Sequence, residues 1–227
     1  MEKVQEKNER MAVARQRGNI YGLLAAVYRQ EITSELLQQI KDPGFLGVCS
    51  DLGLELPGEF FERPEDALLE DLAVEYAGLF IGPGGHISPH ESVHHERLDQ
   101  SEGQLWGEST VNVKKFIEWT GLQYTPEYTG LPDHISVELE FMETVIRQEE
   151  QSWEKGDREG IINCLKMEKR FIEEHLIRWI PAFCEKVLSE AELPFYREMA
   201  ALTKNFIEFE AEEIDSYGAV NGKAAGD

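Results

Sequence analysis

Apolar residues recur along most of this chain with the spacing of amphipathic helices, at i, i+3, i+4, i+7 and i+8. The first stripe consists of Ile20, Leu23, Leu24, Val27 and Tyr28. A second consists of Leu68, Leu69, Leu72, Ala73, Tyr76, Leu79 and Phe80. The strongest consists of Ile135, Leu139, Met142, Val145 and Ile146. No window shows the period-two alternation of a half-buried strand. The sequence therefore predicts an all-α fold.

Residues that favour helix starts stand ahead of several stripes. Thr33 or Ser34 can cap a short helix, and Pro64 suits a first helical position because its missing N–H would be unpaired there anyway. Asp133 is placed to cap the strongest helix, and Asp157 the next one. These residues fix where the main helices are expected to begin.

Glycine and proline mark the expected helix ends. Gly121 and Gly156 are placed as left-handed residues that follow a helix. Pro181 is expected to end or kink a helix near Trp179, with a separate short helix over 183–188 behind it. The last helix is expected from about residue 192 to 214.

We predict a single globular helical domain of roughly nine to eleven helices. An N-terminal part over 1–120 joins a C-terminal part over 133–214 through a hinge segment near 121–132, and residues 215–227 are expected to form a disordered tail. Residues 82–108 lack a helical pattern, and a segment of this length inside a compact domain usually has a function or is disordered.

The chain is strongly acidic. Its 227 residues contain 22 Lys and Arg against 44 Asp and Glu, which gives a net charge of −22. This charge disfavours nucleic acid and anionic membrane surfaces, and it favours a cationic partner or simply high solubility. The N-terminus has no apolar signal core and no run of 18 apolar residues occurs, so we expect a cytoplasmic protein without stable membrane insertion. The cysteines, Cys49, Cys164 and Cys184, show no disulfide or metal spacing, as expected of buried thiols in a reducing compartment.

One stretch matches a zinc-hydrolase motif. His90-Glu91-Ser92-Val93-His94 fits HExxH, in which two histidines one helical turn apart bind zinc and the glutamate acts as a base. Pro89 precedes it, Gly82 to Gly85 lie upstream, and no third-ligand motif follows. We therefore expect no metal site, no cofactor and no catalytic residues. Incidental metal affinity remains open for the histidine cluster, His86, His90, His94 and His95.

The pair Asp133-His134 at the head of the strongest helix has two interpretations. In the structural one, Asp133 is a helix cap and His134 is a polar residue of the first turn. In the functional one, the pair belongs to a binding site. No GxSxG motif and no phosphate-binding loop accompany it, so nucleophilic and nucleotide chemistry have no motif here.

Three segments taken together are similar to one family. They are Tyr76 to Gly84 (YAGLFIGPG), Ser88 to Val93 (SPHESV) and Leu131 to Met142 (LPDHISVELEFM). Their order, spacing and helical setting resemble the TorD/DmsD-type redox-enzyme maturation chaperones, over at least residues 68–146. In that family an aromatic residue usually follows Glu-Ser-Val, where this chain has His94.

The resemblance implies a cytoplasmic, all-α chaperone that is not an enzyme. Its partner would be the catalytic subunit of a redox enzyme, usually one with a molybdopterin cofactor, bound through an N-terminal twin-arginine signal region and held back from export until its cofactor is inserted. The oligomeric state would be a monomer or a helix-exchanged dimer. An acidic body with an apolar groove suits a leader peptide that is basic and then apolar.

The resemblance also implies a set of peptide-binding residues. Asp133 would fix the rim of the groove, His134 would contact the peptide backbone, and Tyr76 and Phe80 would line an apolar floor. The full set is Tyr76, Phe80, Gly82, Pro83, Glu91, Ser92, Asp133 and His134. Two alternatives stay open: a zinc-dependent hydrolase that uses the match at 90–94, and a helical adaptor domain without a peptide groove.

Overall fold

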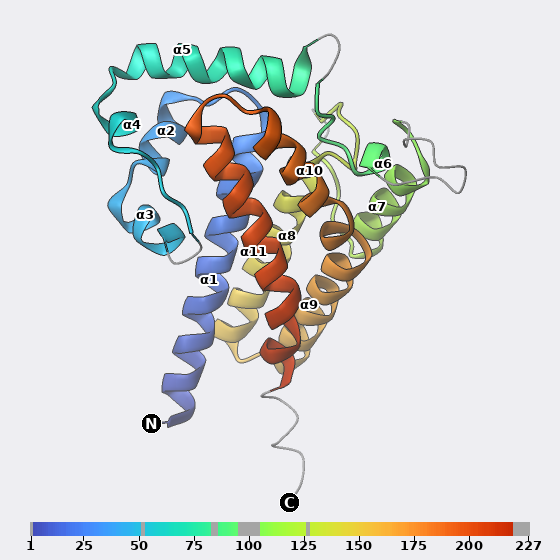
Figure 1. Ribbon diagram of the computed structural model, residues 1–227. Coiled ribbons are helices and arrows are strands. Elements are labelled where there is room, and N and C mark those ends of the chain that lie inside the picture. The colour runs from blue at the N-terminus through green and yellow to red at the C-terminus, as the bar shows by residue number, and fades with distance from the viewer. Residues whose placement is uncertain (1, 51–52, 83–85, 95–104, 126–127, 220–227) are drawn as a thin grey trace, which may run out of the picture.

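A computed structural model describes residues 2–50, 53–82, 86–94, 105–125 and 128–219 (Figure 1). Long helices form a bundle in which α1 packs along α8, α8 packs on α9, and α10 packs on α11. Their bounds are Glu2–Arg29 for α1, Ile135–Lys155 for α8, Arg158–Phe171 for α9, Ile177–Glu190 for α10 and Pro194–Ala219 for α11. The predicted N-terminal and C-terminal parts are thus packed against each other.

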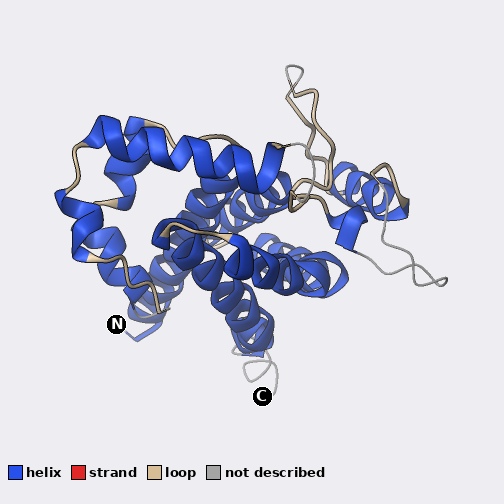
Figure 2. Ribbon diagram, turned by 45° about the horizontal axis from the view of Figure 1, so that its top comes forward, coloured by secondary structure: helices blue, strands red, loops and turns tan. Residues whose placement is uncertain are grey.

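Shorter helices surround one end of this bundle, opposite the two chain ends (Figure 1). They are α2 (Ser34–Ile40), α3 (Pro43–Ser50), α4 (Gly58–Glu62), α5 (Glu65–Tyr76), α6 (Glu91–His94) and α7 (Glu108–Trp119). A π-helical turn, η1 (Ala77–Ile81), continues α5. Figure 2 shows helices and loops, and the described ranges hold no strand beyond one isolated bridge between His90 and His134. The prediction of an all-α fold is confirmed.

Aromatic side chains fill the core where α1, α10 and α11 meet. The Tyr28 and Phe183 rings lie 5.6 Å apart, and Tyr21 and Phe206 lie 4.8 Å apart, both edge to face. Trp179 is fully buried. Because burying one such side chain contributes about 1.5–3 kcal/mol, this aromatic layer is a major source of stability.

Several predicted caps are confirmed. Thr33 Oγ1 accepts a hydrogen bond from Leu36 N at 3.3 Å, and Asp157 Oδ1 accepts one from Gly160 N at 3.0 Å. Gly156 ends α8 with φ +69°, a left-handed conformation that costs glycine little. These caps depend on residues within four positions of each other, which explains why the sequence alone reveals them.

The prediction that Pro181 ends a helix, with a separate helix over 183–188 behind it, was wrong. A π-helical turn, η2 (Ile172–Leu176), joins α9 to α10, and α10 runs unbroken through Pro181 to Glu190. The apolar residues of α10 are buried on both sides of the proline. Their burial outweighs the cost of an internal proline, about 3 kcal/mol.

Helix α11 extends beyond the expected end of the last helix. Residues 215–219, expected in the tail, are helical, and Asp215 pairs with Lys169 of α9. The Tyr217 hydroxyl donates to Glu210 at 3.3 Å. Residues 220–227 lie outside the described residues. In the described part of the chain, no helix combines the length and apolar character needed to cross a bilayer.

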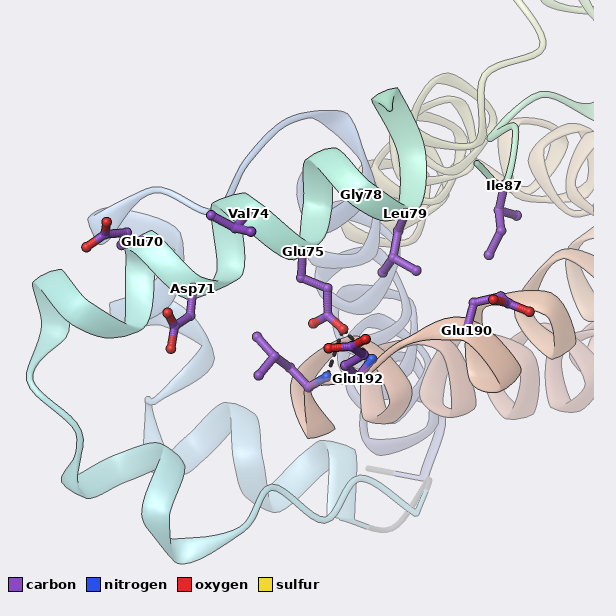
Figure 3. Close-up of a pocket in the computed structure, with 10 residues that line it drawn as sticks. Glu70, Asp71, Val74, Glu75, Gly78, Leu79, Ile87, Glu190 and Glu192 are labelled. Carbon is purple, nitrogen blue, oxygen red and sulfur yellow. Dashed lines mark hydrogen bonds between the residues drawn. The ribbon is translucent and has the colours of Figure 1, made fainter. Parts of the chain in front are cut away.

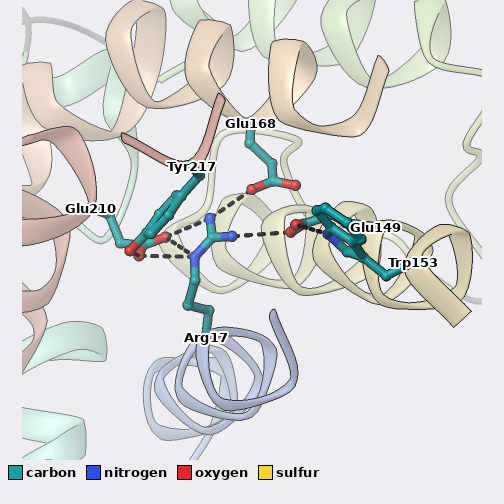
Figure 4. A network of polar contacts seen from close by, with 6 residues as sticks. All are labelled: Arg17, Glu149, Trp153, Glu168, Glu210 and Tyr217. Carbon is teal, nitrogen blue, oxygen red and sulfur yellow. Dashed lines mark hydrogen bonds and ion pairs between the residues drawn. The ribbon is translucent and has the colours of Figure 1, made fainter. Parts of the chain in front are cut away.

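A buried polar network ties four helices together (Figure 4). The Arg17 guanidinium of α1 lies 3.1 Å from Glu149 of α8, 2.6 Å from Glu168 of α9 and 2.9 Å from Glu210 of α11. Burial raises the pKa of Glu168 to about 7, although the positive charge of Arg17 opposes this rise. One cation therefore faces three carboxylates in a site closed to solvent.

Candidate functional site

The two proline-marked connections of the sequence meet in space. Glu91 N donates to Asp133 O at 2.9 Å, and Ile135 N donates to Pro89 O at 2.9 Å. These reciprocal bonds join the start of α6 to the start of α8. We call residues 88–94 and 131–136 together the junction. The structure thus brings together two of the segments that carry the family resemblance.

Asp133 caps a different helix from the one expected. Its carboxylate is fully buried, and Oδ2 accepts a hydrogen bond from Ser92 N at 3.0 Å, in the first turn of α6. The cap of α8 is His134, whose Nδ1 accepts from Ser136 N at 3.2 Å. The prediction that Asp133 caps the long helix was wrong because the bridge places α6 directly against it.

His134 is held in one neutral form. Burial, together with the charges of His90 and Arg29, lowers its pKa to about 3. Since Nδ1 accepts from Ser136 N, and the Ser136 hydroxyl lies 2.8 Å from the same atom, the ring proton is on Nε2. The His90 ring lies 5.0 Å away, edge to face. His134 therefore offers an N–H donor at the junction.

Buried charged and aromatic side chains from η2, α8 and α10 pack against the core side of the junction. His175 Nδ1 lies 2.9 Å from Glu91 Oε2, and Trp179 Nε1 donates to Glu138 Oε2 at 2.9 Å. Burial raises the pKa of Glu138 well above its usual value, and the negative charge of Glu91 adds to this effect. These contacts of His175, Trp179 and Glu138 were not predicted from the sequence. The available signal was an acidic residue, Glu138, on the apolar face of the strongest predicted helix.

Tyr76 and Phe80 point into the core. The Tyr76 hydroxyl donates to Tyr28 O at 3.0 Å, and the Phe80 ring stacks on Phe183 at 6.0 Å. Both side chains are buried under the protein's own residues. Gly82 follows η1, its N–H donating to Ala77 O at 2.7 Å. Pro83, the remaining residue of the expected set in this segment, lies outside the described residues.

The three HExxH side chains have three different surroundings. His90 faces His134, Glu91 pairs with His175, and His94 Nε2 lies 2.7 Å from Ser88 O. The His94 ring also packs on Trp179 and Phe183, where the family usually has an aromatic residue. Across the described residues, no group of three or more His, Cys, Asp or Glu is arranged to hold a metal ion.

Two buried side-chain oxygens of the junction lack a hydrogen-bond partner among the described residues. They are Ser92 Oγ and Asp133 Oδ1. A buried polar atom left unpaired costs about 1–3 kcal/mol, so such atoms are rare unless a ligand or water reaches them. Both oxygens belong to residues of the peptide-binding set that the family resemblance implies.

Two cavities open beside the junction. One, of about 610 Å³, includes Leu79 and Ile87 from the segment before it and is lined by carboxylates from both α5 and the turn between α10 and α11 (Figure 3). The other, of about 510 Å³, includes Ser136 and Val137 at the start of α8. Its walls carry Tyr124 and Tyr128, whose rings stack at 5.9 Å.

Comparison with known proteins found one family model and several similar proteins. The model of the family described as nitrate reductase delta subunit matches residues 34–185. Chaperone protein TorD of Photobacterium profundum is 28% identical over 215 residues, covering 89% of this chain and 96% of that protein. Chaperone protein TorD of Shewanella pealeana is 24% identical over 213 residues, covering 88% and 90%. A solved structure of a proposed redox enzyme maturation protein from Archaeoglobus fulgidus aligns with a TM-score of 0.47 and 19% identity, covering 85% and 92%.

The family match spans more than half of the chain, and the relatives align over nearly their whole length. The chain belongs to the nitrate reductase delta subunit family, as a TorD-type chaperone for redox enzyme maturation that is not itself an enzyme.

Proposed function

We propose that this chaperone binds the N-terminal twin-arginine signal region of a molybdopterin-type redox enzyme subunit in the cytoplasm, and retains that subunit until its cofactor is loaded. The observation that carries the proposal is the pair of unpartnered buried atoms at the junction, Asp133 Oδ1 and Ser92 Oγ. An incoming peptide brings backbone N–H and guanidinium donors, which are the groups that these two oxygens lack.

The remaining expected residues have roles that follow from their positions. His134 offers its Nε2–H to a peptide carbonyl, since Nδ1 is already occupied by Ser136. Glu91 adds a carboxylate beside Ser92. Tyr76, Phe80, Gly82 and Pro83 belong to the segment ahead of the junction, and the two aromatic rings contact the peptide only when this segment moves away from the core.

The charge of the chain supports the same class of partner. A net charge of −22 accelerates encounter with a basic leader, while burial of its apolar part slows release. Exposed ion pairs contribute only about 0–1 kcal/mol each, so the charge alone does not hold the peptide. An apolar anchor contributes about 1.5–3 kcal/mol per side chain, and a few anchors are enough for micromolar binding.

Calorimetry with a synthetic peptide tests the proposal. The peptide carries two adjacent arginines followed by a run of apolar residues, as in a twin-arginine leader. Asp133→Asn removes the charge from an acceptor without changing its shape, and we expect affinity to fall about 10- to 100-fold, the equivalent of one charge-assisted hydrogen bond.

Asp157→Asn is the matched control, because Asp157 also caps a helix but lies at the turn between α8 and α9. It should leave the affinity unchanged. Circular dichroism should show equal helicity in both variants and in the unmodified chain. If the Asp133→Asn variant binds the peptide as tightly as the unmodified chain does, the junction is not the binding site.

A further inference from the structure

The cavity next to α5 is an apolar groove with an acidic rim, which we call the acidic groove. It lies between α5 with η1 on one side and the turn from α10 to α11 on the other (Figure 3). Its apolar residues are Val74, Leu79, Ile87 and Leu193, and its acidic residues are Glu70, Asp71, Glu75, Glu190 and Glu192. Its volume of about 610 Å³ is enough for several side chains of a peptide.

The charges of the acidic groove are poorly compensated. No lysine or arginine occurs among the described residues that line it. Asp71 pairs with Arg63, and the charge of Arg197 acts on Glu75, but both arginines lie outside the lining, while Glu70, Glu190 and Glu192 are exposed. Carboxylates gathered around an apolar floor of low dielectric concentrate a negative potential there. A cationic ligand is the chemical complement of this surface.

Glu75 gives the acidic groove a specific acceptor. Its Oε1 accepts hydrogen bonds from Glu192 N at 2.5 Å and Leu193 N at 2.7 Å, which fixes the turn between α10 and α11. Its Oε2 is buried and has no hydrogen-bond partner in the described part of the chain. Burial raises the pKa of Glu75 because it removes water from the charged carboxylate, although the two backbone donors oppose this rise. A guanidinium would supply the missing donors.

The apolar part of the acidic groove suits the stems of long basic side chains. Val74 is 70% exposed at the rim, and Ile81, the last residue of η1 and outside the lining, is 65% exposed. Arginine and lysine cover such surfaces with their methylene stems while their charged heads reach polar groups. A peptide that carries arginines beside apolar residues therefore fits this surface better than either a purely basic or a purely apolar peptide.

We infer that the acidic groove holds the arginine-bearing stretch of the client's N-terminal peptide, with a guanidinium donating to Glu75 Oε2. This inference rests on the proposed function for the kind of ligand, but it assigns that stretch to a surface outside the junction. Leu79 and Ile87 connect the two regions, because Ile87 N donates to Leu79 O at 2.7 Å in the segment that leads to the junction. A peptide can thus extend from the acidic groove to Asp133.

The test compares two synthetic peptides by calorimetry at low salt. One has two adjacent arginines before an apolar run, and the other has glutamines in their place. In the double variant Glu190→Lys/Glu192→Lys, both altered residues are exposed, so the fold should survive. We expect this variant to bind the arginine peptide about tenfold more weakly and the glutamine peptide nearly unchanged.

The control is Glu154→Lys/Glu159→Lys, which changes the net charge equally at exposed positions in the turn between α8 and α9, at the opposite end of the bundle. It should change the affinity for the arginine peptide less than about twofold. The inference is overturned, and the proposed function stands, if the arginine peptide binds the unmodified chain and its affinity is lowered by Asp133→Asn but not by Glu190→Lys/Glu192→Lys. If neither peptide binds the unmodified chain, both are overturned.

Discussion

Replacing Glu168 by glutamine tests how the buried network around Arg17 sets the pH range in which the chaperone is stable. Glu168 is fully buried, and its pKa in the folded protein is about 7. In the unfolded chain a glutamate has a pKa of about 4.3. The folded state therefore binds this proton more tightly. The resulting stabilisation is complete below about pH 4.3 and is lost as the pH rises through 7.

The magnitude follows from the difference between the two pKa values. At 1.36 kcal/mol per pH unit, ionising Glu168 lowers the free energy of unfolding by about 3–4 kcal/mol between pH 4.3 and pH 8. Glutamine imitates the protonated carboxyl and cannot ionise. We expect Glu168→Gln to match the unmodified chain near pH 5 and to be about 3 kcal/mol more stable at pH 8.

Urea denaturation followed by circular dichroism at pH 5, 6, 7 and 8 measures this difference. Glu159→Gln, at an exposed position in the first turn of the same helix, controls for the loss of one negative charge from an acidic protein. If the free energies of unfolding of Glu168→Gln and of the unmodified chain differ by the same amount at all four pH values, Glu168 does not titrate as described. If the variant is less stable at pH 8, the ion pair with Arg17 outweighs the desolvation of Glu168.

Three further predictions address stability and metal content. Asp157→Ala should lower the free energy of unfolding by about 1 kcal/mol through loss of the α9 cap, and an unchanged thermal midpoint would speak against this cap. Phe171→Ala should cost about 3–5 kcal/mol in urea denaturation, because this fully buried ring contacts Phe116 and Phe141; a loss below 1 kcal/mol would show that the site collapses around the gap. Dialysis against EDTA should leave the melting temperature unchanged, whereas stoichiometric zinc that disappears in a His90→Ala variant would revive the hydrolase alternative.

Features that depend on neighbouring residues could be predicted from the sequence. The stripe from Ile135 to Ile146 lies on the buried face of α8, and the caps at Thr33 and Asp157 bond to residues three positions away. Periodicity and capping operate within one or two helical turns, so a single sequence contains all the information that they need.

Features that depend on tertiary contacts could not be predicted. Asp133 caps α6 through Ser92, which is 41 positions away, and no local pattern reveals that partner. Glu138 and Glu168 are buried, but the chain has 44 acidic residues, and composition does not show which of them are buried. For the site, the family resemblance selected four residues that meet at the junction, namely Glu91, Ser92, Asp133 and His134. It also selected Tyr76 and Phe80, which lie in the core, and it did not reveal the contacts of His175 and Trp179 with this region.

The packing of α1 along α8 has a consequence for how this protein is made. Residues 30–134 separate the two helices, so the face of α1 that packs on α8 stays uncovered until that whole stretch has been translated, although Tyr28 near the end of α1 also contacts Tyr76 and Phe80. At about 5–20 residues per second, this takes roughly 5–20 s on the ribosome. The helix that is made first is therefore among the last to have its apolar face covered.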